Sequence, residues 1–139
     1  MSCDDACDPH SVPLRLLLVD DNAAFLAASR AILRGGELCV VGEAATAAEA
    51  VQRAQELQPD LVLLDIDLGE ESGFEVARQL EASAGPVAPH MIFISAQAPE
   101  DFADIVAESP ALGFIPKAEL SPAAVTDLLR TRGDQRESR

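Results

Sequence analysis

The sequence predicts an α/β protein with a doubly wound parallel β-sheet, covered by helices on both faces. Five short runs are apolar, which is typical of strands buried in a parallel sheet. Helix-length segments with capping signals separate these runs, so strands and helices alternate along the chain. The predicted strands are Leu14–Val19, Leu38–Glu43, Leu61–Leu64, Met91–Ile94 and Leu112–Ile115. Together with five helices, they predict one five-stranded sheet.

The first helix is expected over Asn22–Arg34, because its Ala and Leu residues favour a helix and Gly35-Gly36 stops it. Phe25, Ile32 and Leu33 are the apolar side chains of this segment that we expect to point inward.

Capping-box patterns begin the next two helices. In such a box a Ser or Thr side chain accepts a hydrogen bond from the backbone N–H three residues later. Thr46 with Glu49 predicts a helix that runs to about Leu57, and Ser72 with Glu75 predicts the third helix.

Proline residues mark the last two helices. Pro99 opens an acidic helix that fades before Pro110, and Ser121-Pro122 caps the final helix. Residues 131–139 are highly charged, so we expect a frayed C-terminal tail there.

Length and charge limit the classes of function. The chain has 139 residues, which suits a single domain, here residues 14–130. Its net charge of −14, from 24 acidic and 10 basic residues without a basic stripe, opposes direct binding of nucleic acid. No apolar run approaches the roughly 18 residues that a membrane span needs. We therefore expect a cytoplasmic protein.

The cysteines agree with a reducing compartment. Cys39 lies in an apolar run and is expected to be a small, reduced core residue. Cys3, Cys7 and His10 match no standard zinc spacing, so residues 1–13 are read as a disordered acidic tail rather than a metal site or a secretory signal.

Polar residues stand at the ends of four of the apolar runs. Asp20 and Asp21 follow the first run, Asp65 follows the third, Ser95 follows the fourth, and Lys117 comes shortly after the fifth. Right-handed crossovers place these ends at one edge of the sheet, where ligands of open α/β sheets bind. Three carboxylates, a hydroxyl and an ammonium group at one edge predict a site for magnesium and a phosphoryl group.

The segments LLLVDDN, PDLVLLDIDL, MIFISA and GFIPK stand in this order along the chain. In this order and spacing they resemble the response regulator receiver domain, the phosphoacceptor module of two-component signalling. The resemblance covers about Leu14 to Arg130. It implies a flavodoxin-like sheet with the strand order 2-1-3-4-5.

The resemblance also assigns roles to the acidic residues. It implies that Asp65 is the nucleophile that becomes phosphorylated. Asp21 would bind Mg²⁺ directly, Asp20 largely through water, and the backbone carbonyl of Asp67 would complete the metal site, with Mn²⁺ as an alternative ion. Taken without the resemblance, the acids could also form a solvated loop cluster.

By the same resemblance, Lys117 pairs with Asp65 at rest and later with the phosphoryl oxygens. Ser95 donates its hydroxyl to a phosphoryl oxygen, and Phe114 is the switch aromatic that moves inward when Ser95 shifts. Simpler interpretations are a surface lysine, a serine that bonds local backbone, and a static core phenylalanine.

Three further residues border the path of attacking water in the family. They are Asp67, Ala96 and Gln97 in this sequence. We expect them to tune the lifetime of the phosphorylated state.

Two positions depart from the pattern of the family. The loop after Asp65 lacks the proline that is common there, which puts its rigidity in doubt. Lys117 is followed by Ala118 where relatives often carry a cis proline, and Pro116 precedes the lysine instead. A cis bond before alanine would cost about 3 kcal/mol, so we do not assume one.

The main functional prediction is a stand-alone receiver, not a turnover enzyme. A histidine kinase or phosphotransfer protein would phosphorylate Asp65, and the altered surface would bind a protein effector or a second copy of the chain. One alternative is a Mg²⁺-dependent phosphohydrolase that uses Asp65 and Asp67, although the short connections leave no room for a substrate-covering cap. Another is a constitutive adaptor, which phosphorylation of Asp65 would exclude.

Overall fold

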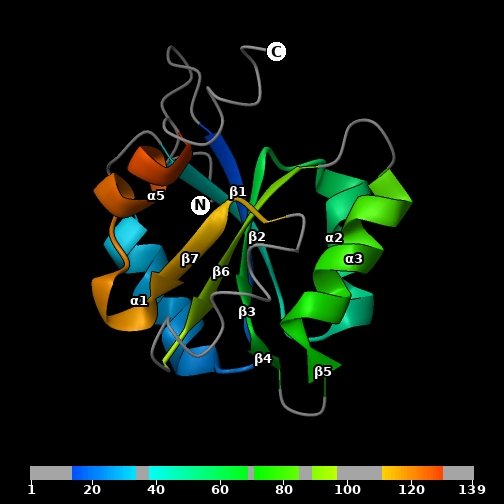
Figure 1. Ribbon diagram of the computed structural model, residues 1–139, viewed down its shortest axis with the longest axis horizontal. Coiled ribbons are helices and arrows are strands. Elements are labelled where there is room, and N and C mark those ends of the chain that lie inside the picture. Colours follow the sequence, from blue (N-terminus) through cyan, green and yellow to red (C-terminus); the bar gives the residue numbers. More distant parts are fainter. Residues whose placement is uncertain (1–13, 34–37, 69–70, 85–88, 97–110, 130–139) are drawn as a thin grey trace, which may run out of the picture.

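The computed structural model describes residues 14–33, 38–68, 71–84, 89–96 and 111–129. Within these ranges, five parallel strands form one sheet in the order β2-β1-β3-β6-β7 (Figure 1). The strands of this sheet are β1 (Leu14–Val19), β2 (Leu38–Ala44), β3 (Leu61–Asp65), β6 (His90–Ser95) and β7 (Gly113–Pro116). Counted along the chain without the separate hairpin β4-β5, this is the predicted order 2-1-3-4-5, which is confirmed.

The described residues contain four α-helices: α1 (Ala23–Leu33), α2 (Ala47–Leu57), α3 (Gly73–Ala84) and α5 (Pro122–Leu128). Figure 1 shows α1 and α5 on one face of the sheet and α2 and α3 on the other. The predicted helix that opens at Pro99 lies outside the described residues. The doubly wound arrangement is confirmed.

The core has two halves, one on each face of the sheet. Side chains of a strand point alternately to opposite faces, and β1 shows this alternation. Leu16 and Leu18 belong to the cluster on the α1 and α5 side, and Leu17 and Val19 belong to the cluster on the α2 and α3 side. All four are at most 1% exposed. Burying each such side chain contributes about 1.5 to 3 kcal/mol to folding.

Side-chain caps begin α2 and α5 as the sequence predicts. Thr46 Oγ1 accepts a hydrogen bond from the Glu49 N–H (3.2 Å), and Ser121 Oγ accepts one from the Ala124 N–H (3.0 Å). In a capping box the Glu side chain also accepts a hydrogen bond from the N–H of the capping residue, here Thr46. At α2, Glu49 Oε1 instead accepts from the N–H of Ala45 (2.8 Å), one residue before Thr46.

The connection from β3 to α3 is more regular than the sequence indicates. It contains β4 (Asp67–Leu68) and β5 (Glu71–Ser72), which pair antiparallel in a small hairpin. Ser72 Oγ accepts from the N–H of Phe74 (3.2 Å). The Gly73 N–H donates to the Ile66 carbonyl (2.7 Å) and fastens the hairpin to the end of β3. This connection therefore has backbone pairing where the family often has a proline.

One inward assignment on α1 is wrong. Ile32 is 42% exposed, whereas Leu26, Ser29 and Leu33 are buried. Successive helix residues are rotated by about 100° around the axis. The face that buries Leu33 therefore turns Ile32 outward, and Phe25 is only partly buried.

Cys39 also differs from expectation. It is buried in β2 as predicted, but it is disulfide-bonded rather than a reduced thiol. The other two cysteines of the chain, Cys3 and Cys7, lie outside the described residues.

Among the residues that the structure describes, no helix has the length and apolar character needed to cross a membrane.

Candidate functional site

The first two acidic residues are placed by the buried strand β1. The Asp20 N–H donates to the Ala44 carbonyl (3.0 Å), so hydrogen bonding to β2 continues one residue beyond β1. The side chain of Asp20 is therefore held inside the fold, and the residue is 1% exposed. Asp21, the next residue, is exposed.

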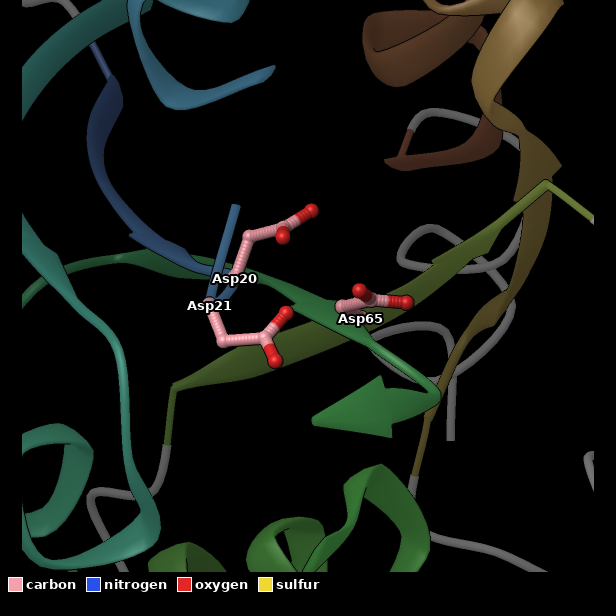
Figure 2. Close-up of side chains that lie close together, drawn as sticks. All are labelled: Asp20, Asp21 and Asp65. Atoms are coloured by element: carbon pink, nitrogen blue, oxygen red, sulfur yellow. The ribbon is translucent and has the colours of Figure 1, made fainter. Parts of the chain in front are cut away.

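Asp65 ends the adjacent strand β3 and is 4% exposed. Figure 2 shows its side chain beside those of Asp20 and Asp21, which leave the end of β1. Each of the three residues offers a carboxylate oxygen, and these oxygens lie within 4.8 Å of one another. The predicted convergence of the three acids at one edge of the sheet is therefore present.

The parallel register brings the hydroxyl and the ammonium group to the same edge. Asp65 stands opposite Ile94, so Ser95 extends one residue further on β6 and stands opposite Pro116 of β7. Ser95 is buried. Lys117 then begins η4, a 3₁₀ turn over Lys117–Glu119.

Lys117 bridges two of the acids. Its Nζ lies 2.8 Å from Asp20 Oδ2 and 3.3 Å from Asp65 Oδ2. Both contacts are ion pairs, and the one to Asp65 is also a hydrogen bond. At rest the lysine is therefore shared between two carboxylates, whereas the sequence predicts a pair with Asp65.

Electrostatics keep this lysine charged. Burial alone would lower the pKa of the Lys117 ammonium group, but its contacts with Asp20 and Asp65 outweigh that effect. The pKa of Lys117 therefore lies above its ordinary value.

The set of donors fits a divalent cation. The three carboxylates carry three negative charges when ionised, and Lys117 compensates one of them. Two negative charges then remain at a site where two of the acids are buried, which is costly without a counter-ion. Oxygen ligands of this kind are those that hard divalent cations prefer. Asp20, Asp21 and Asp65 could thus hold such an ion.

The remaining predicted residues lie around this cluster or outside the described part. Ala96 is exposed and directly follows Ser95. The backbone of Asp67 lies in β4, next to the end of β3. Phe114 is partly buried on β7 and packs against the core on the α2 and α3 side. Gln97 lies outside the described residues.

The peptide bond between Lys117 and Ala118 is trans. The sequence alone did not decide this point.

Sequence reasoning missed the roles of two residues near the cluster, Asn22 and Phe25. Asn22 caps α1, because its Oδ1 accepts from the N–H of Phe25 (3.1 Å), and its own N–H donates to Asp20 Oδ1 (2.8 Å). The Phe25 ring faces the ammonium group of Lys117, with Nζ 4.2 Å from the ring centroid. The preference of Asn for helix N-caps was the signal that could have identified the first. No local signal identifies the second, since Phe25 and Lys117 are far apart in the sequence.

Known proteins are similar to this chain in sequence and fold. The family model of the response regulator receiver domain matches residues 16–130. A crystal structure of a LuxR-family two-component response regulator from Aurantimonas sp. SI85-9A1 superposes with a TM-score of 0.71 at 28% identity, over 86% of this chain and 84% of that chain.

Relatives extend beyond the matched region. The sensory transduction protein LytT of Bacillus cereus (strain ATCC 14579) is 33% identical over 105 residues, which are 75% of this chain and 41% of LytT. The DNA-binding transcriptional activator EvgA of Escherichia coli (strain K12) is 27% identical over 106 residues, 76% of this chain and 51% of EvgA. The chain spans about half the length of the first curated relatives that it matches. Because the family model matches residues 16–130 and three acids and a lysine meet at one edge of the sheet, the chain belongs to the response regulator receiver domain family of two-component systems.

Proposed function

We propose that this receiver domain is a switch in which Asp65 accepts a phosphoryl group with the help of Mg²⁺. The observation that carries the proposal is the position of Lys117, whose Nζ contacts Asp20 and Asp65 at the ends of two different strands. An ammonium group at that place can balance negative charge on Asp65 before transfer and on the phosphoryl oxygens afterwards.

The proposed transfer breaks the P–N bond of a phosphohistidine and forms a P–O bond to a carboxylate oxygen of Asp65. The leaving imidazole nitrogen keeps the bonding electron pair and can take up a proton from water. A Mg²⁺ ion held by Asp20, Asp21, Asp65 and the Asp67 carbonyl would balance the charge of the phosphoryl oxygens. Lys117 binds one phosphoryl oxygen, and the Ser95 hydroxyl donates a hydrogen bond to another.

The donor would be a histidine kinase or phosphotransfer protein, and the output would be a changed affinity for a protein partner in the cytoplasm. Asp67, Ala96 and Gln97 would tune how long Asp65 stays phosphorylated. The predictions that the receiver stands alone and that it does not bind DNA itself stay predictions.

Incubation with acetyl phosphate and Mg²⁺ tests the proposal. Intact-mass spectrometry should detect one added phosphoryl group, and chelation of Mg²⁺ should prevent it. Asp65→Asn should abolish this addition. Asp60→Asn, which changes the acid directly before the other end of β3, should still be phosphorylated. An Asp65→Asn protein that is labelled at the wild-type rate would refute the assignment.

A further inference from the structure

Phe25 contacts Lys117 but has no role in the transfer proposed above. The Lys117 Nζ lies 4.2 Å from the centroid of the Phe25 ring, which is within the range of a cation–π interaction. The Lys117 side chain is only 19% exposed. Because the negative face of the ring attracts the ammonium group most strongly where water is excluded, this contact stabilises one position of Nζ.

The backbone of Phe25 is linked through Asn22 to the acid that Lys117 contacts. Asp20 Oδ1 accepts from the Asn22 N–H (2.8 Å), and Asn22 Oδ1 accepts from the Phe25 N–H (3.1 Å). The Phe25 ring then faces Lys117, and Lys117 Nζ returns to Asp20 Oδ2 (2.8 Å). Four residues therefore form a closed circuit of contacts, with Asp65 attached to it through Lys117 (3.3 Å).

We propose that Phe25 is a positioning residue for phosphoryl transfer, because its ring fixes the Lys117 ammonium group beside Asp20 and Asp65. This inference rests on the proposed function. The ring does not touch the reacting atoms; it limits where Nζ stands when a phosphoryl group arrives. Misplacing a group that stabilises the transferred charge slows transfer.

A purely structural role is the competing explanation. Phe25 also packs against the core cluster on the α1 and α5 side. Removing its ring could therefore disturb α1 and slow transfer without any specific effect on the lysine. Two measurements separate these roles.

The first measurement is NMR of the wild-type protein, which needs neither phosphorylation nor a variant to be informative. Protons on the Lys117 carbon next to Nζ should be shifted upfield by the ring current of Phe25. The shift should persist in Phe25→Tyr, which keeps a ring, and disappear in Phe25→Leu. Wild-type protons at the ordinary lysine position would overturn the inference.

The second measurement is a double-mutant cycle on the rate of phosphorylation by acetyl phosphate in saturating Mg²⁺. Phe25→Leu should slow the reaction about two- to tenfold when Lys117 is present, and Phe25→Tyr should restore most of the rate. In a Lys117→Met background, Phe25→Leu should change the rate less than twofold. Ile32→Ala, on the outward face of the same helix, is the matched control and should leave the rate unchanged.

The outcomes distinguish this inference from the proposed function. If Phe25→Leu slows the reaction equally in both backgrounds, its role is structural and the inference fails while the proposed function stands. If Lys117→Met phosphorylates as fast as wild type, the role of the lysine in the proposed function fails. Phe25 then has no part in the transfer either, even if the ring current shows that its ring lies over Nζ.

Discussion

The two ends of the same sheet differ in how their charged side chains are partnered. At the end where β1 and β3 begin, Arg15 and Asp60 are joined through their backbones and the Asp60 carboxylate, and the Arg15 guanidinium bonds to a backbone carbonyl. The Arg15 N–H donates to Asp60 Oδ2 (2.9 Å), the Asp60 N–H donates to the Arg15 carbonyl (2.8 Å), and Arg15 Nη1 donates to the Gln58 carbonyl (2.8 Å). The Asp60 carboxylate and the Arg15 guanidinium thus each have a hydrogen-bond partner in the backbone of the fold.

At the opposite end, Asp20, Asp21 and Asp65 gather around the single ammonium group of Lys117. Two of these acids are buried, so water screens the repulsion between their charges poorly. The charged groups at the first end are bonded within the fold, whereas the second end has more acids than cations and could hold a metal ion. Local conflicts of this kind are typical of functional sites.

The largest expected effect comes from moving the backbone of the acidic end with Gly73→Ala. A Cβ on Gly73 would lie 2.2 Å from the Asp65 carbonyl oxygen and 2.8 Å from Ile66 Cα, so backbone must shift. We expect a loss of about 3 kcal/mol in the free energy of unfolding, measured in urea, and slower phosphorylation of Asp65.

Gly113→Ala is the matched control for this substitution. A Cβ on Gly113 would meet the end of the Leu128 side chain at 3.0 Å, and that side chain can move. The expected loss is about 1 kcal/mol. Equal losses for the two variants would contradict the proposed difference between a backbone clash and a side-chain clash.

The next effect is stabilisation by Mg²⁺, which should act on one end only. At a concentration of 100 times the Kd, Mg²⁺ should raise the free energy of unfolding by about 2.7 kcal/mol. In calorimetric titrations, Asp21→Ala should weaken binding more than Asp20→Ala, because a direct ligand loses more than a water-mediated one. Asp60→Ala should bind Mg²⁺ like wild type. Equal affinities in the two site variants would refute the division of roles.

Without divalent ions, replacing an aspartate by alanine should change the free energy of unfolding in opposite directions at the two ends of the sheet. Asp60→Ala removes the acceptor of the Arg15 N–H and should destabilise the fold by about 1 kcal/mol. Asp21→Ala removes one of three like charges and should stabilise it by about 0.5 kcal/mol. Chemical denaturation in the presence of a chelator measures both. Destabilisation by Asp21→Ala would show that its charge is already balanced.

The acidic edge was predictable because each of its residues directly follows a strand that can be identified from its own short stretch of sequence. A buried parallel strand reads as an apolar run, so the residue that follows it, such as Asp65 after Leu64, is placed at the edge by sequence alone. The strand order came from the resemblance to the family, because periodicity does not specify which strands are neighbours.

The missed features depend on packing between distant residues. The rotation of α1 about its axis decides that Ile32 faces outward, and Cys39 is disulfide-bonded although it lies in an apolar run. The contact between Phe25 and Lys117 needs α1 and the end of β7 to be placed in space. None of these follows from a short window of sequence.

The most distant effect is the change that phosphorylation should cause beyond the acidic edge. Beryllofluoride, a phosphoryl mimic, should shift the amide signals of Ser95 and then those of Phe114 on β7 and Val125 on α5. The amides of Arg15 and Asp60 should shift least, because their end of the sheet is already closed. A coupling of about 1 to 3 kcal/mol would change the affinity for a partner about five- to 150-fold. Ser95→Ala should keep the mimic bound but weaken the response on β7 and α5. An unweakened response in that variant, or shifts confined to the three acids, would refute this route of coupling.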